Sequence, residues 1–296
     1  MKWRGRRTSR NIEDRRGGGG FARRGSGRRI PMRGGGKIGG IGAIVIIVLG
    51  LFFGVDTSFL LGGGGSGFSV PSQQVSTGPN QIDDQMEEFV GVVLADTEEV
   101  WAEIFAQAGE RYPAPKLVMF SGQTQSACGF ASAASGPFYC PGDQKAYLDT
   151  GFFQVMAQRL GAKGDFASAY VIAHEVAHHV QNVLGILPKV NQQRARVSQA
   201  ESNRLSVMVE LQADCFSGVW ARRAQARFGS LEPGDIEEAL NAAAQIGDDT
   251  LQRNAGRAVV PDSFQHGSSA QRVRWFKRGL ESGDINQCDT FNAARL

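Results

Sequence analysis

The spacing of apolar residues along the chain predicts a long helix over residues 82–108. Apolar side chains recur there at every third or fourth position with acidic residues between them, as on an amphipathic helix. Two prolines, Pro113 and Pro115, then break the pattern. Short apolar runs follow, and they predict strands over residues 116–121, 137–140 and 146–149.

From Phe152 the pattern is helical almost to the end of the chain. Glycine, proline and Asn/Asp breaks divide it into predicted helices over residues 152–161, 166–184, 199–228, 234–254 and 268–281. A small sheet followed by a mostly helical remainder predicts an α+β fold.

Residues 38–55 form a different kind of segment, without a charge or a proline. As a helix they would extend about 27 Å, close to the thickness of a hydrocarbon core. We therefore expect one transmembrane helix here. A buried core helix and a cleaved signal peptide are the alternatives. The long basic stretch before the segment favours an uncleaved anchor, and no small-x-small cleavage site stands out clearly after Val55.

Charge is divided unevenly about this segment. Residues 1–37 hold 13 Lys and Arg against Glu13 and Asp14, a net charge of +11. The other 259 residues hold 19 basic and 27 acidic side chains, a net charge of −8. By the positive-inside rule, the N-terminus is expected in the cytoplasm. The C-terminal domain is then expected on the outer, periplasmic or extracytoplasmic, side of the cell membrane.

These features predict four regions. They are a disordered basic cytoplasmic tail at residues 1–37, the transmembrane helix at 38–55, a flexible linker at 56–80 and a folded domain at 81–296. The tail resembles RGG-type sequence that binds nucleic acid. Beside a membrane segment, a topology signal that contacts anionic headgroups is the simpler interpretation, so no nucleic-acid partner is expected.

The strongest chemical signal is His174-Glu175-Val-Ala-His178, which lies within a run of apolar residues. Residues i and i+4 of a helix project from one face, so both imidazoles can bind one ion. Zinc needs about 2.0–2.1 Å to each nitrogen, and Glu175 can reach a metal-bound water. Unpaired ionisable groups are costly to bury among apolar neighbours, which favours a zinc site over solvated surface histidines.

A third protein ligand has to come from elsewhere in the chain. The metzincin pattern is excluded because it would place a histidine at Leu184. Glu210 and Asp214 lie i, i+4 on the next long predicted helix, among apolar neighbours. One carboxylate can bind zinc while the other accepts the free ring N–H of a ligand histidine. Glu201 is the second candidate, but its polar neighbours indicate solvent.

The chain holds two more histidines. His179 points about 100° away from His178 on the helix, and we expect a packed or surface side chain rather than a ligand. His266 lies in a Gly/Ser-rich loop before the last predicted helix. It could donate a hydrogen bond to the oxyanion of a tetrahedral intermediate, and a helix-capping or surface role is the alternative.

Several motifs, taken in order, resemble one known family. The segments GPFYCPGDQKAYLD, HEVAHHVQN, ELQADCFSGVWA and HGSSAQRVRWFKRG closely resemble the bacterial neutral zinc metallopeptidases of the YpfJ type, over roughly residues 81–296. The metal site of such proteins is similar to that of the gluzincin class. The resemblance implies a zincin-like domain with one Zn²⁺. It also implies site residues: His174, His178 and Glu210 as ligands, Glu175 as general base, Asp214 as partner of a ligand histidine, and a transition-state role for His266.

All four cysteines lie in the predicted outer domain. No Cys-x-x-Cys occurs, so a second, structural zinc site is not expected. Cys128 and Cys140 bracket a Gly/Ala/Ser-rich loop, which favours a local disulfide and leaves Cys215 to pair with Cys288. Free buried thiols are the alternative.

The sequence therefore predicts a membrane-anchored zinc metallopeptidase that hydrolyses a peptide or protein substrate outside the cytoplasmic membrane. Zinc would activate the attacking water, and Glu175 would move its proton to the leaving amine. The alternative is a zinc-stabilised interaction or scaffold module without turnover. The presence of Glu175 argues against it, because a structural metal site does not need a base.

Overall fold

The computed structural model of the protein describes residues 1–16, 84–132 and 135–296. Its main body opens with helix α3 (Gln85–Gln107), whose N-cap residue Asp84 accepts a hydrogen bond from the Glu87 amide. The apolar face of α3 is buried in the main core of the molecule. This helix confirms the one predicted over residues 82–108.

A four-stranded sheet follows, with the strand order β1-β2-β6-β5. Strands β2 (Lys116–Phe120) and β6 (Lys145–Asp149) run parallel at its centre, and β5 (Phe138–Cys140) pairs antiparallel with β6. Strand β1 (Ile12–Asp14) runs parallel to β2 at the other edge. Strands β3 (Gln123–Ser126) and β4 (Gly129–Ser132) form a separate hairpin.

Alternation along β2 buries both faces of the sheet centre. Leu117 and Met119 belong to the main core with the helices, whereas Val118 and Phe120 form a smaller cluster with Tyr147 on the opposite face. The centre of the sheet is therefore buried on both faces, and the helices pack on one of them.

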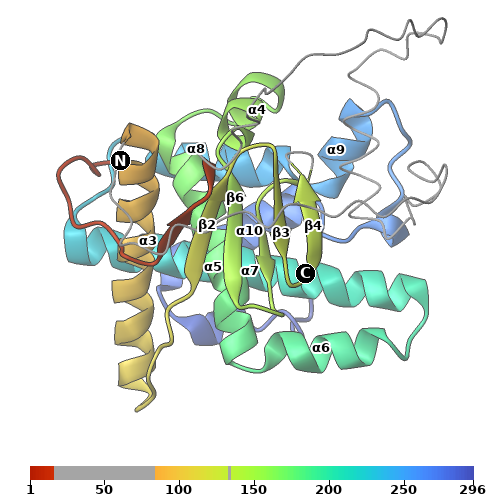
Figure 1. The fold of residues 1–296 in the computed structure, drawn as a ribbon. Helices are drawn as coiled ribbons and strands as arrows, with labels where there is room; N and C mark the ends of the chain where they lie inside the picture. The colour runs from red at the N-terminus through yellow and green to blue at the C-terminus, as the bar shows by residue number, and fades with distance from the viewer. Residues whose placement is uncertain (17–83, 133–134) are drawn as a thin grey trace, which may run out of the picture.

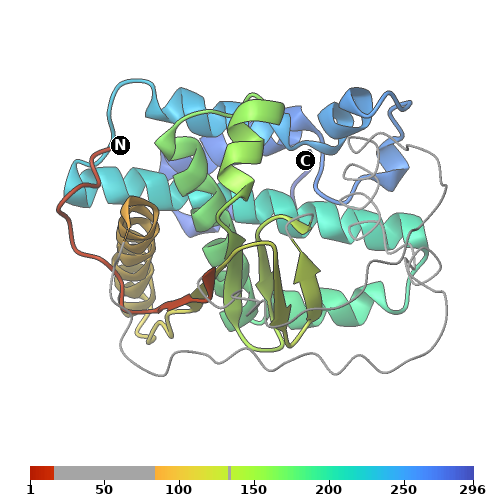
Figure 2. The same ribbon diagram turned by 45° about the horizontal axis from the view of Figure 1, so that its top comes forward.

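The rest of the chain is helical and surrounds α5 (Asp165–Val183), which packs on the sheet, on α7 (Gln199–Phe228) and on α8 (Asp235–Gln245). In Figure 2 the long helix α7 runs across the molecule, with the sheet on one side and the C-terminal helices on the other. The remaining elements are α4 (Phe152–Arg159), α6 (Ile186–Arg194), α9 (Asp248–Asn254), α10 (Ser269–Ser282) and the 3₁₀ turns η3 (Pro261–Ser263) and η4 (Ile285–Cys288) (Figure 1).

The predicted α+β arrangement is confirmed, with three differences in the elements. The helix expected over 234–254 is divided into α8 and α9 at Gly247, where a Cβ would lie 2.4 Å from the Ser269 nitrogen. Helix α6 was not predicted, because a proline such as Pro188 usually indicates a helix break. In the structure Pro188 is the third residue of α6, where its missing N–H removes no intrahelical hydrogen bond. Neither β1 nor the β3–β4 hairpin was predicted.

Both disulfides favoured by the sequence are present. Cys128 is bonded to Cys140, which connects the β3–β4 hairpin to edge strand β5. Cys215 is bonded to Cys288, which ties η4 to the middle of α7. The described residues contain no free cysteine.

The first sixteen residues differ from the predicted disordered tail. The Met1 amino group donates a hydrogen bond of 2.6 Å to Asp165, at the start of α5. The Arg6 guanidinium donates two hydrogen bonds, of 2.7 and 2.9 Å, to Asp96 on α3. Ile12 is buried and stands opposite Leu117 in the sheet. The arginines that indicate a disordered tail in sequence are partly used here as partners for carboxylates of the body.

The predicted transmembrane helix, and the cellular placement based on it, need correction. In the part of the chain that the structure describes, no helix combines the length and apolar content needed to cross a bilayer. Residues 38–55 themselves lie outside the described residues. The predicted topology would also put residues 1–16 and the C-terminal domain on opposite sides of a membrane, whereas β1 shares a sheet with β2. The expectation of a single-pass membrane protein is therefore not supported.

Candidate active site

Two neighbouring helices bring the three predicted metal ligands together. His174 and His178 project from α5, and Glu210 projects toward them from α7. The Nε2 atom of His174 lies 3.0 Å from Glu210 Oε2, and Nε2 of His178 lies 3.5 Å from Glu210 Oε1. Ligand atoms that bind one zinc ion tetrahedrally at ~2.0–2.1 Å stand roughly 3.3 Å apart. The two measured separations are close to this value, and all three ligand atoms lie within 4.8 Å of one another, so the cluster could hold a metal ion.

The charges of this cluster are strongly coupled. Burial lowers the pKa of His174, but contacts with Asp214 and Glu210 outweigh it and raise the pKa to about 9. Burial raises the pKa of Glu210, but the neighbouring His178 and His174 hold it well below its usual range. Without a metal, a proton on His174 therefore compensates the buried carboxylates, and a cation that binds Nε2 has to replace it.

Each candidate ligand histidine has a polar partner on its other ring nitrogen. Nδ1 of His174 lies 3.0 Å from Asp214 Oδ1, an ion-pair contact rather than an aligned hydrogen bond. Nδ1 of His178 lies 2.9 Å from Gln181 Oε1, and Gln181 in turn donates to the carbonyl oxygen of Val209 on α7. Such partners fix the tautomer and the orientation of a ligand ring.

Of these two partners, the sequence indicated only Asp214. Gln181 lies one turn after His178 on the same helix, and this i, i+3 spacing was the available signal. Glutamine is so common on helix surfaces that the spacing did not distinguish a buried, fully hydrogen-bonded side chain from a solvated one.

Glu175 is close to the cluster without being part of its hydrogen bonds. It is 9% exposed and, among the described residues, makes no hydrogen bond or ion pair. Burial raises its pKa, against the lowering effect of His178 and His174. A carboxylate with a raised pKa and no fixed partner can accept a proton from a water bound between it and the histidines.

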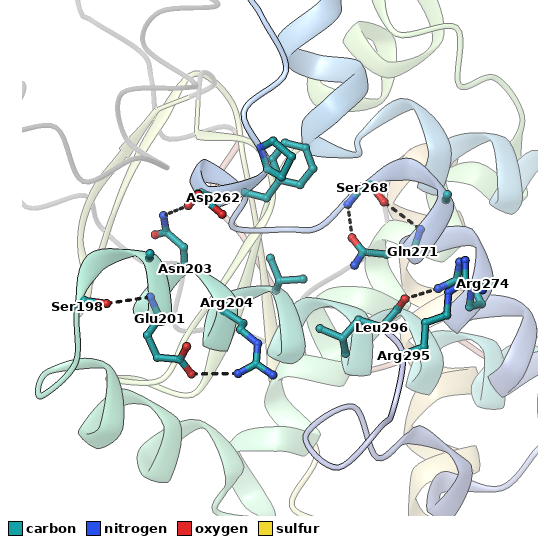
Figure 3. A pocket seen from close by; sticks show the side chains of 15 residues that line it. Ser198, Glu201, Asn203, Arg204, Asp262, Ser268, Gln271, Arg274, Arg295 and Leu296 are labelled. Atoms are coloured by element: carbon teal, nitrogen blue, oxygen red, sulfur yellow. Dashed lines mark hydrogen bonds and ion pairs between the residues drawn. The ribbon is translucent and has the colours of Figure 1, made fainter.

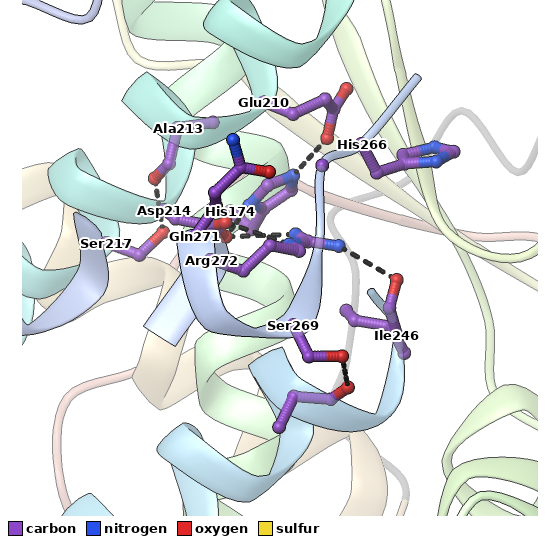
Figure 4. Close-up of polar contacts among 12 residues, drawn as sticks. His174, Glu210, Ala213, Asp214, Ser217, Ile246, His266, Ser269, Gln271 and Arg272 are labelled. Carbon is purple, nitrogen blue, oxygen red and sulfur yellow. Dashed lines mark hydrogen bonds and ion pairs between the residues drawn. The ribbon is translucent and has the colours of Figure 1, made fainter. Parts of the chain in front are cut away.

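His266 is held at the cluster by a residue that the sequence did not reveal. Its Nδ1 lies 2.9 Å from Asp248 Oδ1, and Asp248 Oδ2 accepts the backbone N–H groups of Gln265, His266 and Gly267. Burial lowers the pKa of His266, but Asp248 and the charge of Glu210 raise it above the ordinary value. Figure 4 shows His266 on the same side of the cluster as Glu210. Asp248 lies inside the single helix predicted over residues 234–254, so nothing in the sequence pattern pairs it with this loop; in the structure it is the first residue of α9.

His179 is packed, as expected. It is 1% exposed, its Nε2 donates a hydrogen bond of 2.6 Å to the Pro113 carbonyl, and its Nδ1 lies 3.0 Å from the Tyr139 hydroxyl. It therefore connects α5 to strand β5 and to the loop before β2, and it points away from the cluster.

Glu201, the second candidate for the third ligand, lies elsewhere. It pairs with Arg204 at 3.2 Å at the edge of a cavity of about 770 Å³ between the first half of α7, η3 and the start of α10 (Figure 3). None of His174, His178 and Glu210 lines this cavity. Glu201 is therefore not brought to the cluster.

Comparison with known proteins agrees with this geometry. The model of a family described as "Putative neutral zinc metallopeptidase" matches residues 1–291. The chain belongs to this family. The "Uncharacterized protein YpfJ" of Escherichia coli strain K12 is 51% identical over 292 residues, which cover 98% of this chain and 99% of the relative. The "Uncharacterized protein Mb2605" of Mycobacterium bovis is 46% identical over 195 residues, 62% of this chain and 65% of the relative. No solved structure matches the chain.

Membership of the zinc metallopeptidase family has two consequences. It implies zinc as the metal and a peptide as the substrate class. The match also begins at residue 1, which agrees with the packing of residues 1–16 on the body. The resemblance recognised over residues 81–296 therefore extends to the N-terminal segment.

Proposed function

We propose that the protein is a zinc-dependent peptidase in which His174, His178 and Glu210 bind one Zn²⁺. The observation that carries this proposal is the placement of their ligand atoms. Two imidazole nitrogens from α5 stand 3.0 and 3.5 Å from the two oxygens of one carboxylate on α7, close to the spacing of a tetrahedral zinc site. A bound zinc ion would polarise the scissile carbonyl. It would also lower the pKa of a bound water, so that this water can lose a proton and attack the carbonyl at neutral pH.

The protein's own residues would then move the protons. Glu175 accepts the proton of the attacking water and returns it to the nitrogen of the leaving amine. Its raised pKa favours this exchange, because the carboxyl then holds the proton more readily between the two transfers. His266, held by Asp248, donates a hydrogen bond from Nε2 to the substrate's carbonyl oxygen as negative charge develops there.

Two ligand partners would keep the geometry fixed during turnover. Asp214 faces Nδ1 of His174, and Gln181 faces Nδ1 of His178. Both imidazoles are thus directed to present Nε2 to the ion. This arrangement distinguishes the two rings from His179, whose Nε2 is occupied by a carbonyl oxygen.

The proposal is tested with the purified chain, a chelator and variants of single carboxylates. Glu175→Gln should retain about one zinc ion per chain but lose cleavage of an unfolded protein substrate. Glu210→Gln should lose both zinc and cleavage. Glu201→Gln is the matched control, because this glutamate is on the same helix but faces solvent and Arg204, and it should behave as the wild type.

The outcomes separate catalysis from a purely structural metal. If Glu175→Gln and the wild type show the same chelator-sensitive cleavage, the base assignment is wrong. If the wild type binds zinc but cleaves no substrate of any class, the domain is a zinc-stabilised interaction module instead. His266→Ala should lower kcat by about 10²–10³-fold with zinc retained, and unchanged kcat would remove His266 from the mechanism.

A further inference from the structure

Helices α7 and α10 approach so closely that their backbones touch. A Cβ at Gly218 of α7 would lie 2.1 Å from the Phe276 carbonyl oxygen. A Cβ at Gly279 of α10 would lie 1.9 Å from the Cys215 carbonyl oxygen. Only glycine fits at either position, and together they set the spacing of the two helices. Asp214 and Arg272 lie one and two turns before these glycines, on the same helix faces, and so come into contact.

Arg272 binds both carboxylate oxygens of Asp214 through one edge of its guanidinium. Nε donates a hydrogen bond of 2.8 Å to Asp214 Oδ2, and Nη2 donates one of 2.9 Å to Oδ1. The Tyr170 hydroxyl also donates to Oδ1 and accepts from Nη2 at 3.2 Å. The remaining nitrogen, Nη1, donates to the Ile246 carbonyl oxygen at 3.3 Å. All these partners are fixed by separate elements, as Figure 4 shows for Arg272, Asp214 and Ile246.

The pair is buried beside the metal cluster rather than at the surface. Arg272 is 2% exposed, and Asp214 and Tyr170 are fully buried. A buried ion pair is seldom the most stable filling of such a space, since apolar residues of similar volume often serve as well. The same Oδ1 that Arg272 and Tyr170 hold lies 3.0 Å from Nδ1 of His174. The Arg272–Asp214 pair is therefore in direct contact with a proposed zinc ligand.

We propose that Arg272 is a positioning residue for the metal site and acts through Asp214. Its planar fork fixes the carboxylate, so that Oδ1 stays opposite Nδ1 of His174 and the ring presents Nε2 to the ion. Tyr170 supports the same oxygen from α5. The inference rests on the proposed metal site, and it adds a residue that holds the carboxylate behind His174.

The experiment measures zinc affinity of the full chain by competition with a chromophoric chelator, together with the thermal midpoint of the metal-free protein. Arg272→Met should weaken zinc binding by about 10-fold or more, in the range found for partners of metal ligands. Arg272→Lys should recover only part of this loss, because an ammonium supplies the charge but not the fork. Tyr170→Phe keeps the ring and removes one donor, and should weaken binding by a few fold.

Two comparisons separate positioning from general stability. Arg6→Met is the matched control, since Arg6 makes a similar two-bond pair with Asp96 on α3, and neither residue contacts a proposed ligand. It should lower the thermal midpoint and leave zinc affinity unchanged. In the double variant with Asp214→Asn, Arg272→Met should cause little further loss of affinity, because both changes remove the same interaction.

Specific results would overturn the inference. Zinc affinity equal to that of the wild type in Tyr170→Phe and in either Arg272 variant would show that the network only stabilises the fold. Independent, additive losses in the double variant with Asp214→Asn would show that Arg272 does not act through that carboxylate. If the wild type itself binds no zinc, the proposed metal site fails, and this inference fails with it. If Arg272→Met does not fold, Tyr170→Phe and Arg272→Lys still decide the question.

Discussion

Zinc affinity should depend on pH far more steeply than ordinary histidine ligands allow. In the metal-free protein His174 lies between Asp214 and Glu210, whose contacts overcome the effect of burial and raise its pKa to about 9. Nε2 cannot bind zinc while it carries a proton. Below pH 9, zinc binding must therefore release this proton, and the apparent affinity should rise about tenfold for each pH unit.

The size of the effect follows from that pKa. At pH 7, about two units below that pKa, the proton reduces the apparent zinc affinity about 100-fold. Between pH 6 and 8 this one group gives a change of about 100-fold. A histidine with the ordinary pKa of about 6.5 would give only about 4-fold over the same interval. The two cases are easily distinguished.

The assay is a chelator competition between pH 6 and 8.5, corrected for the pH dependence of the chelator. Asp214→Asn removes one of the two carboxylates, so its affinity should rise less steeply with pH. A change of less than about 5-fold between pH 6 and 8 in the wild type would show that His174 is not held protonated. The sign of the linkage also predicts that the metal-free fold gains stability from His174 below about pH 6.5, and loses it as pH rises through about 9.

Three further predictions concern residues around the cluster. Burial lowers the pKa of His266, and Asp248 raises it. Asp248→Asn should therefore move the alkaline limb of a kcat/KM profile to lower pH. If that limb does not move, His266 is not the group that sets it. Gln181→Leu should weaken zinc binding about 10–100-fold and destabilise the fold by about 1–3 kcal/mol in urea unfolding, because it removes the partner of His178 Nδ1 and of the buried Gln212 side-chain oxygen. Cys215→Ala opens a bridge spanning 73 residues and should cost about 4 kcal/mol, against about 3 kcal/mol for the 12-residue bridge of the hairpin. Equal losses of stability, or a larger loss for the hairpin disulfide, would contradict this chain-entropy argument.

Local patterns in the sequence were enough to predict the proposed zinc ligands, together with Glu175 and Asp214. The His-Glu-x-x-His spacing places three groups on one turn of α5, and the i, i+4 spacing of Glu210 and Asp214 places two carboxylates on one face of α7. Helical periodicity alone decides both arrangements. That α7 passes beside α5 at the right register depends on packing, and for this step the order of family motifs was the main guide.

The residues that hold Asp214 and His266 in place could not be predicted, because they come from other segments of the chain. Arg272 is 58 residues from Asp214, and His266 is 18 residues from Asp248. An arginine or an aspartate within a predicted amphipathic helix usually faces solvent. Only the close approach of α7 and α10 at Gly218 buries the first pair, and a tertiary contact of this kind leaves no periodic signal in one sequence.

The order of residues 1–16 is hidden from sequence analysis for a related reason. Arginine and glycine dominate residues 1–37, and such a composition predicts a disordered tail. Within it, Ile12 extends the sheet next to β2, and Arg6 pairs with Asp96. Strand pairing and ion pairs with residues 80 or more positions away outweigh local composition, and a sequence window of ordinary length does not contain those partners.

The most direct test of the central claim is to locate the metal in crystals of the zinc-loaded protein by anomalous scattering at the zinc edge. We predict one zinc ion with Nε2 of His174, Nε2 of His178 and a carboxylate oxygen of Glu210 at about 2.0–2.2 Å. A zinc ion bound elsewhere, or one bound by the histidines with Glu210 more than about 3 Å away, would contradict the proposed site.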